Sequence, residues 1–308
     1  MTRTAGVVLA AGAGRRLRPI SNAWPKPLTP VLGRTLLDRA IDALHRVGAE
    51  QVLVNTHVGA DRIEEHLRST WPRVRTRREA ALSGPAGALR CFRDDLASYD
   101  EVLVVSGDAL FDDPLEGLLA AHRRRAASLT FGTRTVRQAH QFGVLDIDED
   151  DTLLGAREKP DVSPDLPLTV SAGIYALRPE AIDALPSDGV ADFVPDLFPA
   201  LQGQGATVLT HPLTGHWFDV GSPAALHDAI AHLLRGHPTR QHVDTDAIIA
   251  PDATLHGWVA IERGARIGRG AWVQDSVMLP GAEVPDGAFV IGGVLGALTI
   301  TTDESGGR

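Results

Sequence analysis

Short aliphatic runs alternate with helical patterns along the first three quarters of the chain. The runs Gly6–Ala10, Gln51–Asn55 and Glu101–Val105 are rich in valine and leucine, as strands buried on both faces are. Apolar residues recur at helical spacing between these runs, and the helices expected there span residues 34–47, 61–67 and 114–124. This β-α-β order predicts an α/β domain with a mixed, mostly parallel sheet, whose ligands bind beyond the carboxyl ends of the strands.

A second pattern occupies the C-terminal part of the chain. Aliphatic residues recur at every sixth position from Ile249 to Leu279, and most are followed four positions later by a small or β-branched residue. Such a hexapeptide register is typical of a short left-handed parallel β-helix, whose triangular coils turn one aliphatic side chain per face inward. The register slips by one residue around Pro280 and returns at Val284 and Val290.

These two patterns predict how the chain is divided. The expected parts are an α/β domain in residues 1–234, a polar linker in 235–244, the β-helix in 245–297 and a disordered tail in 298–308. The last helix of the α/β domain is expected over residues 223–234.

Composition limits the ligands and partners. The 308-residue chain has a formal charge of -9, so no basic face for nucleic acid or for a membrane surface is expected. No stretch reaches the ~20 apolar residues of a membrane span. The single cysteine, Cys91, cannot form an internal disulfide, which suits a reducing compartment. We therefore expect a cytoplasmic protein whose anionic ligands meet a local cluster of cations.

Lysine is almost absent from the chain. Of the 30 lysine and arginine residues, only Lys26 and Lys159 are lysines, and each stands directly before a proline. A compact ammonium on a flexible stem differs chemically from a planar guanidinium. Both lysines are therefore candidate site residues.

The loop after the first aliphatic run, Leu9–Pro19, combines glycines with arginines. Gly12 and Gly14 allow backbone N–H groups to approach an anion. A dinucleotide fingerprint would have a third glycine where Arg16 stands, and a Walker A loop would end in Gly-Lys-Ser/Thr, so neither motif is present. Three arginines and Lys26 provide enough positive charge for a triphosphate.

The segment Leu9–Pro30 resembles the signature L-A-x-G-x-G-x-R-L-x-P, followed by P-K-P, of the sugar-1-phosphate nucleotidylyltransferases. The resemblance implies a Rossmann-like nucleotidyltransferase domain that uses an NTP and a sugar 1-phosphate and releases pyrophosphate. It also implies that Arg16 contacts the distal phosphates and that Lys26 lies near the α-phosphate. The implied nucleotide-binding residues are Leu9, Ala11, Gly12, Gly14, Arg16, Lys26, Gly84 and Gly87.

Further segments extend the resemblance toward the nucleobase and a metal ion. Ser83–Leu89 resembles the L-G-T-A-G-A-L segment that frames the base, although Pro85 replaces the threonine. The residues around Asp108 resemble the family's G-D, and Trp217–Pro223 resembles its W-x-D-I-G-T-P. The resemblance implies that Asp108 and Asp219 bind Mg²⁺, a hard cation that prefers carboxylate oxygens.

The remaining motifs are assigned to the sugar phosphate. Phe142–Val144 resembles F-G-V, Arg157–Pro160 resembles E-K-P, and Thr169–Tyr175 resembles N-x-G-I-Y, with Ser171 where many members carry asparagine. The implied substrate-binding residues are Gly143, Glu158, Lys159 and Gly173, and the implied catalytic residues are Arg16, Lys26, Asp108 and Lys159.

The base and the sugar stay open. The segments 25–31 and 54–57 are closest to the mannose- and heptose-phosphate guanylyltransferases and the muramate-phosphate uridylyltransferases, which favours guanylyl transfer to a mannose- or heptose-type 1-phosphate. The alternative is adenylyl, uridylyl or thymidylyl transfer to another sugar or cyclitol phosphate.

A different class of protein is a non-catalytic relative that binds a nucleotide-sugar as a regulator or scaffold. Such a relative would have lost some of the charged site residues, but all five are present, namely Arg16, Lys26, Asp108, Lys159 and Asp219. We also expect a homo-oligomer, assembled through the β-helix of residues 245–297.

Overall fold

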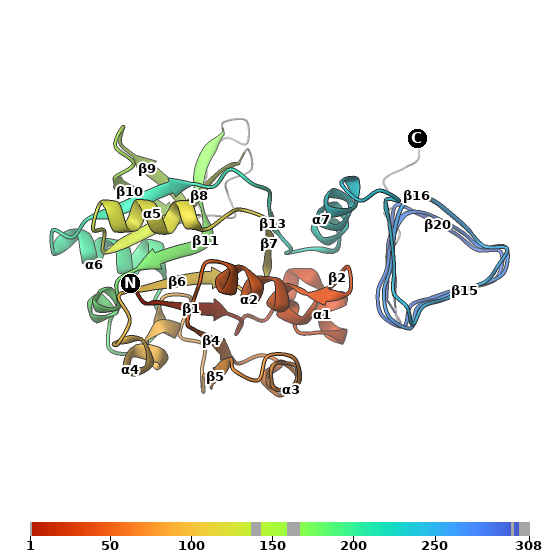
Figure 1. The fold of residues 1–308 in the computed structure, drawn as a ribbon, viewed down its shortest axis with the longest axis horizontal. Helices are drawn as coiled ribbons and strands as arrows, with labels where there is room; N and C mark the ends of the chain where they lie inside the picture. Colours follow the sequence, from red (N-terminus) through yellow and green to blue (C-terminus); the bar gives the residue numbers. More distant parts are fainter. Residues whose placement is uncertain (1, 137–142, 159–166, 297–298, 302–308) are drawn as a thin grey trace. The chain divides into compact units, whose positions relative to one another are not determined.

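The protein is described by a computed structural model that covers residues 2–136, 143–158, 167–296 and 299–301 (Figure 1). The chain forms two compact units: the first comprises residues 1–12 and 39–217, and the second comprises residues 13–38 and 218–308. We predicted a domain boundary at residue 234, the end of the last helix of the α/β domain. The two compact units divide the chain at other positions. Residues 13–38 and 218–234 group with the C-terminal coils.

The first unit is built on a mixed sheet. Its strands β6, β1, β4 and β5 are parallel neighbours in that order, and β11 joins the other side of β6 in the antiparallel sense. Their bounds are Glu101–Ser106, Thr4–Leu9, Gln51–Thr56, Arg75–Arg78 and Leu168–Leu177. The three predicted aliphatic runs are thus β1, β4 and β6, and the predicted α/β class is confirmed.

Further strands extend the sheet beyond β11. Strands β8 and β9 both pair with β11, β10 pairs with β9, and β12 pairs with β8. Their bounds are Leu129–Val136, Gly143–Ile147, Leu153–Glu158 and Val208–Pro212. These pairings mix parallel and antiparallel neighbours, whereas the β6-β1-β4-β5 half is parallel throughout.

The predicted helices are present, with their ends shifted by a few residues. They are α2 (Leu36–Arg46), α3 (Ala60–Thr70), α5 (Glu116–Arg124) and α7 (Pro223–Arg235). Helix α2 begins with a capping box in which the N–H of Asp38 donates to Thr35 Oγ1 and the N–H of Thr35 donates to Asp38 Oδ2, at 3.1 and 3.0 Å. Within the described part of the chain, every helix is too short or too polar to cross a membrane.

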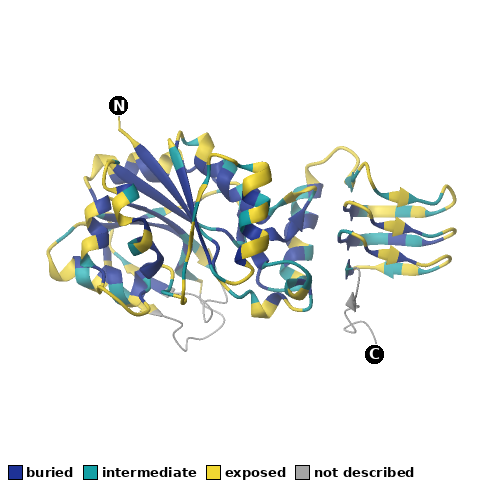
Figure 2. Ribbon diagram, turned by 90° about the horizontal axis from the view of Figure 1, so that it is seen from below, coloured by how far each residue is buried: buried dark blue, intermediate teal, exposed yellow. Residues whose placement is uncertain are grey.

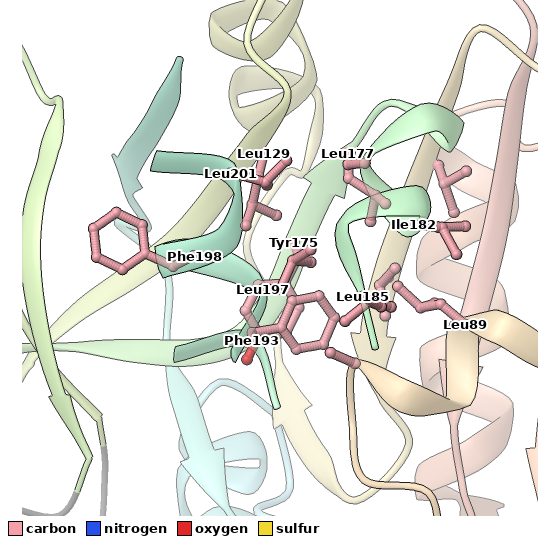
Figure 3. Packing of buried hydrophobic residues seen from close by; sticks show 14 of the residues in the cluster. Leu89, Leu129, Tyr175, Leu177, Ile182, Leu185, Phe193, Leu197, Phe198 and Leu201 are labelled. Carbon is pink, nitrogen blue, oxygen red and sulfur yellow. The ribbon is translucent and has the colours of Figure 1, made fainter. Parts of the chain in front are cut away.

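An aromatic stack anchors the core of the first unit (Figure 3). The ring of Tyr175 on β11 lies parallel to that of Phe193, with centroids 3.6 Å apart and planes 8° apart. The edge of Phe131 on β8 meets the same tyrosine at 5.3 Å. The edge-to-face contact adds to the stabilisation from buried area. The stack therefore ties β11 to β8 and to Phe193, which matters because β11 carries the predicted site residue Gly173.

The C-terminal part of the second unit winds into stacked coils. Viewed along their axis the strands outline a triangle (Figure 1), and from the side they lie in layers with buried residues inside (Figure 2). Parallel pairing joins residues 18 positions apart, as for Gln241 with Val259 and Thr254 with Trp272. Since 18 residues are three hexapeptides, this pairing agrees with the predicted six-residue register.

The strands of these coils are short. They are β14 (Gln241–Val243), β15 (Ile248–Ile249), β16 (Thr254–Ile261), β17 (Arg266–Ile267), β18 (Trp272–Met278), β19 (Glu283–Val284), β20 (Phe289–Ile291), β21 (Val294–Gly296) and β22 (Thr299–Thr301). Strand β14 lies in the segment predicted as a linker, and β22, antiparallel to β21, lies in the predicted tail. Residues 302–308 lie outside the described residues.

The predicted position of the register slip is wrong. His256 pairs with Gln274, but Val259 pairs with Ser276, so the second coil is one residue short at Asp275 and not near Pro280. Asp275 adopts a left-handed conformation with φ 46°. Its side-chain Oδ1 accepts a hydrogen bond from the backbone N–H of Trp258 at 3.1 Å, which satisfies a donor on the longer coil.

A buried histidine makes the stability of the first unit depend on pH. His122 on α5 is buried, and its Nδ1 lies 2.9 Å from Thr130 Oγ1. Burial lowers the pKa of His122 from 6.5 to about 4, against the opposing effect of the Glu101 carboxylate. The folded state therefore favours the neutral ring, and its advantage is complete above pH 6.5 and is lost as the pH falls toward 4. We expect the free energy of unfolding to decrease by about 3 kcal/mol across this range.

This expectation is measured by urea unfolding at pH 7 and pH 4.5. A His122→Gln variant should lose less stability between the two pH values than the wild type, because its side chain takes up no proton. The matched control is His237→Gln, which changes an exposed histidine and should keep the wild-type pH dependence. Equal pH dependence in His122→Gln and the wild type would show that another group is responsible.

Candidate active site

A pocket of about 340 Å³ lies in the first unit. Its volume is within the range of small-ligand sites, about 300–1,000 Å³. Two of the predicted glycines contribute to it from segments far apart in the sequence, Gly12 after β1 and Gly84 after β5. The lining residues are Ala11, Gly12, Asn55, Glu79, Leu82, Gly84, Pro85 and Val190.

The polar centre of this pocket is the carboxylate of Glu79. Its Oε1 accepts from the side-chain amide of Asn55 at 2.5 Å. Its Oε2 accepts from the backbone N–H of Ser83 at 2.9 Å and from the Ser83 hydroxyl. The Asn55 amide is itself fixed, because Asn55 Oδ1 accepts from the N–H of Ala10 at 2.8 Å. Glu79 is thus a preorganised acceptor.

Sequence reasoning missed both polar residues of the pocket. Asn55 is at the carboxyl end of β4, so the rule that ligands bind beyond such strand ends could have found it. Glu79 follows β5, whose sequence Arg75–Arg78 is polar and mostly exposed and carries no aliphatic signal. An edge strand of this kind is held by its backbone pairing with β4.

The Ser83–Leu89 segment is shaped by close backbone contacts. Gly84 has φ 80°, and a Cβ there would lie 2.4 Å from the backbone oxygen of Ala191, so only glycine fits. Gly87 is buried and begins a 3-10 helix (Gly87–Phe92), and its N–H donates to the same Ala191 oxygen at 3.0 Å. Gly84 therefore lines the pocket, whereas the N–H of Gly87 is used within the protein.

Asp108 and Gly173 lie near the carboxyl end of β6 in the first unit. Asp108 is half-buried and follows Gly107, whose missing side chain leaves room for the backbone oxygen of Leu9. Gly173 has φ 70° at a bulge in β11, and a Cβ there would lie 2.5 Å from Ser106 Oγ. Ser171, where the family often has asparagine, hydrogen-bonds the Tyr175 hydroxyl at 3.1 Å.

The predicted sugar-phosphate residues are only partly covered by the described residues. Gly143 on β9 lies directly opposite Glu158 on β10 in the antiparallel register. The structure thus brings two of the predicted substrate-binding residues together. Lys159 lies outside the described residues.

The second unit brings three other predicted residues together. The carboxylate of Asp219, at the end of β13 (Trp217–Asp219), accepts from Lys26 Nζ at 3.2 Å through Oδ1 and from Arg16 at 3.1 Å through Oδ2. The Lys26 side chain is only 6% exposed, and that of Arg16 is 61% exposed. One carboxylate therefore holds a buried ammonium and an exposed guanidinium, and this cluster has a net positive charge.

Gly14 packs against the side-chain stem of Lys26. It adopts φ 56° just before the 3-10 turn Arg15–Leu17, and a Cβ there would lie 2.7 Å from Lys26 Cβ. The loop backbone thus packs against the lysine stem, so glycine is required both by the conformation and by the contact. Gly14 and Lys26, which were predicted from the two parts of one signature, pack against each other.

The family assignment comes from comparison with known proteins. Residues 5–236, three quarters of the chain, match the family model described as nucleotidyl transferase. The chain belongs to this family. The matched residues include the loop Leu9–Pro19, the residues that line the pocket, and the charge cluster formed by Arg16, Lys26 and Asp219.

Relatives of this nucleotidyl transferase carry names that specify different bases. It is 32% identical over 246 residues to a UTP–glucose-1-phosphate uridylyltransferase of Synechocystis, with 74% of this chain and 63% of the relative covered. It is 28% identical to the mannose-1-phosphate guanylyltransferase of Mycobacterium tuberculosis, with 92% and 82% covered. It is 28% identical to a valienol-1-phosphate guanylyltransferase of Streptomyces hygroscopicus, with 90% and 86% covered.

Proposed function

We propose that this nucleotidyl transferase transfers GMP from GTP to a mannose- or heptose-type sugar 1-phosphate, forming a GDP-sugar and pyrophosphate. The observation that carries the choice of base is the fixed Glu79 carboxylate in the pocket of the first unit. The general reaction is supported by the family and by relatives whose names give sugar-1-phosphate nucleotidyl transfer.

The carboxylate discriminates between bases through its hydrogen-bonding character. An ionised carboxylate only accepts hydrogen bonds and offers about four positions, of which protein donors take three. A base must therefore approach Glu79 with a donor. Guanine can give its N1–H or its N2 amino group to the one remaining position, and the neighbouring group is then also a donor. In adenine and uracil an acceptor stands beside the donor and would face the negative charge. This pattern favours guanine.

The charge cluster of the second unit suits the phosphates. Attack by an anionic sugar phosphate on an anionic triphosphate requires neutralisation of charge and in-line positioning, and it requires no protein nucleophile. Lys26 would stabilise the charge that develops at the α-phosphate. Arg16, whose guanidinium is exposed, would hold the departing pyrophosphate. Lys159 is proposed to bind the incoming sugar phosphate.

We further propose Mg²⁺ as the metal ion, with Asp108 and Asp219 as its carboxylate ligands. Carboxylate oxygens fit a hard cation, which typically also binds substrate phosphates. When bound, the ion would supply positive charge to the phosphate oxygens. Asp219 meanwhile holds Arg16 and Lys26 in place.

The names of the relatives support guanylyl transfer and define the alternatives. Two of the three relatives described above are guanylyltransferases by name, for mannose 1-phosphate and valienol 1-phosphate. The third is named for UTP and glucose 1-phosphate. A uridylyl transfer, or a cyclitol phosphate as acceptor, is therefore the second candidate.

The C-terminal coils complete the proposal. We propose that their six-residue register and parallel pairing form a short left-handed parallel β-helix. We also propose that the chain forms a homo-oligomer through these coils. Light scattering should then give a mass greater than that of one chain.

The test of the proposed reaction is pyrophosphate release with a panel of NTPs and sugar 1-phosphates. GTP with mannose 1-phosphate or a heptose 1-phosphate is expected to give the highest kcat/KM. Faster turnover with UTP or ATP would contradict the choice of base. Absence of pyrophosphate with every pair, while nucleotide-sugar still binds, would favour a non-catalytic relative.

A Glu79→Gln variant tests whether the Glu79 carboxylate selects guanine over other bases. The amide replaces one acceptor with a donor, so the ratio of kcat/KM for GTP to that for UTP should fall at least about tenfold, as expected for loss of a specific base contact. The matched control is Glu65→Gln, which removes a similar charge from the exposed surface of α3. An unchanged ratio in Glu79→Gln would mean that this carboxylate does not read the base.

A further inference from the structure

The segment that follows Lys26 is anchored on the C-terminal coils. It forms the hairpin β2 (Pro30–Val31) and β3 (Arg34–Thr35), whose turn residues Leu32 and Gly33 both have positive φ, 53° and 74°. This is the φ pattern of a tight two-residue hairpin turn. The turn points its Gly33 N–H at the coils.

The coil residue that receives this turn is Glu262. Its side chain is almost completely buried, with the residue 2% exposed, and its Oε2 accepts the hydrogen bond from the Gly33 N–H at 3.0 Å. The ring of His242 lies beside the turn, at van der Waals distance (3.4 Å) from where a Cβ on Gly33 would be. Leaving such a buried acceptor without its donor is costly.

A second contact anchors the segment that follows Asp219. Helix α7 begins directly after Ser222, which caps it: Ser222 Oγ accepts from the N–H of Ala225 at 3.1 Å. One turn further on, His227 Nε2 lies 2.9 Å from the backbone oxygen of Asp275. Because a carbonyl only accepts, Nε2 carries the proton of this hydrogen bond. The ring also meets Trp258 edge-on, with centroids 4.7 Å apart.

This second contact uses the irregularity in the coils. Asp275 is the position at which the coil is one residue short, and its carboxylate occupies the space that a side chain at residue 257 would need. A Cβ on Gly257 would lie 2.2 Å from Asp275 Oδ1. The shortened coil thereby presents the Asp275 carbonyl to helix α7.

We propose that the C-terminal coils position the ion pair between Lys26 and Asp219, with Glu262 anchoring the lysine side and Asp275, through His227, anchoring the aspartate side. Glu262 and His227 are then positioning residues for the transfer reaction. The inference rests on the proposed function for its effect on turnover, but its structural part concerns the second unit alone. The coils would contribute to catalysis in each chain in addition to any role in assembly.

The test compares Glu262→Ala, which removes the acceptor, with Glu262→Gln, which keeps an acceptor oxygen. In hydrogen exchange of the full chain, Glu262→Ala should exchange faster than the wild type in peptides that cover residues 26–33. Its kcat for pyrophosphate release should fall on the order of tenfold, with the KM for GTP nearly unchanged, because misplaced groups lower the rate more than binding. In Glu262→Gln, the hydrogen exchange over residues 26–33 and the kcat for pyrophosphate release should both be close to the wild-type values. The matched control is Glu283→Ala, an exposed glutamate on β19 of the same coils.

The outcomes separate this inference from the proposed function. Unchanged exchange over residues 26–33 in Glu262→Ala, or the same change in Glu283→Ala, would overturn the positioning role. If the wild type releases no pyrophosphate, the proposed function fails, and the exchange comparison still decides whether the coils hold this segment. Should Glu262→Ala fail to fold, His227→Phe keeps the ring but loses the donor. It is then expected to speed exchange over residues 219–226, and unchanged exchange there would overturn the inference.

Discussion

Replacing Lys26 with methionine is expected to lower the rate of pyrophosphate release by about 10³-fold, the range for losing one preorganised charge in a water-excluded site. Methionine keeps most of the apolar stem that packs against Gly14 and removes only the ammonium. Asp219 retains its pair with Arg16 in this variant, so no carboxylate is left without a cation. We therefore expect folding to be retained while turnover is lost.

The measurement is single-turnover and steady-state pyrophosphate release, with thermal unfolding as the check on folding. Lys26→Arg keeps the charge but should also be impaired, because a planar fork is larger than an ammonium and the lysine is 6% exposed. Arg46→Met, a change of an exposed cation at the end of α2 and outside the loop, is the matched control and should stay within a few-fold of the wild type. Wild-type rates in Lys26→Met would remove this lysine from the mechanism.

Replacing Asp219 with asparagine is expected to impair both stability and activity. The carboxylate stands between two cations, at 3.2 Å from Lys26 and 3.1 Å from Arg16. Without its charge the buried ammonium loses its counter-ion, which typically costs about 3–5 kcal/mol when the pair is fully buried. Because Asp219 is 21% exposed, we expect a decrease of about 3 kcal/mol in the free energy of unfolding.

Turnover of Asp219→Asn is expected to fall at least about 10²-fold even where the variant is fully folded, since Lys26 and Arg16 then repel each other and shift apart. Chemical unfolding and pyrophosphate release measure the two effects separately. Asp252→Asn, at an exposed turn of the coils, is the control for loss of one negative charge. A stable Asp219→Asn with full activity would contradict both the ion pair's structural role and its part in the reaction.

The fold was largely predictable because its signals are local. Strands β1, β4 and β6 are continuous aliphatic runs, and α2, α3, α5 and α7 have apolar residues at helical spacing. Strand β5 was not predictable, since Arg75–Arg78 is a polar edge segment that is held by pairing with β4. The register slip was placed wrongly for a similar reason. Leu279 continues the six-residue spacing in the sequence, but Met278 is the residue that pairs with Ile261.

The candidate site likewise contains residues that the sequence identified and residues that it did not. Gly12, Gly14, Arg16 and Lys26 were identified because a loop motif preserves their spacing in the sequence. Glu79 and Asn55 were missed because they meet only through the order β1-β4-β5 in the sheet. The role of Glu262 lies even further from any motif, since it depends on a hairpin turn more than 200 residues away, where Gly33 donates to it.

The sequence alone determined the elements, the charged residues and the resemblance to a family, because hydrophobic periodicity and motif spacing act over a few residues. The tertiary structure alone decided which residues share a hydrogen bond or a charge. It placed Asp219 on both Lys26 and Arg16, made Glu79 the acceptor at the centre of a pocket, and set Glu262 beneath the Gly33 turn. These contacts join residues from distant segments, and their positions follow from the packing of the sheet and coils that no local pattern encodes.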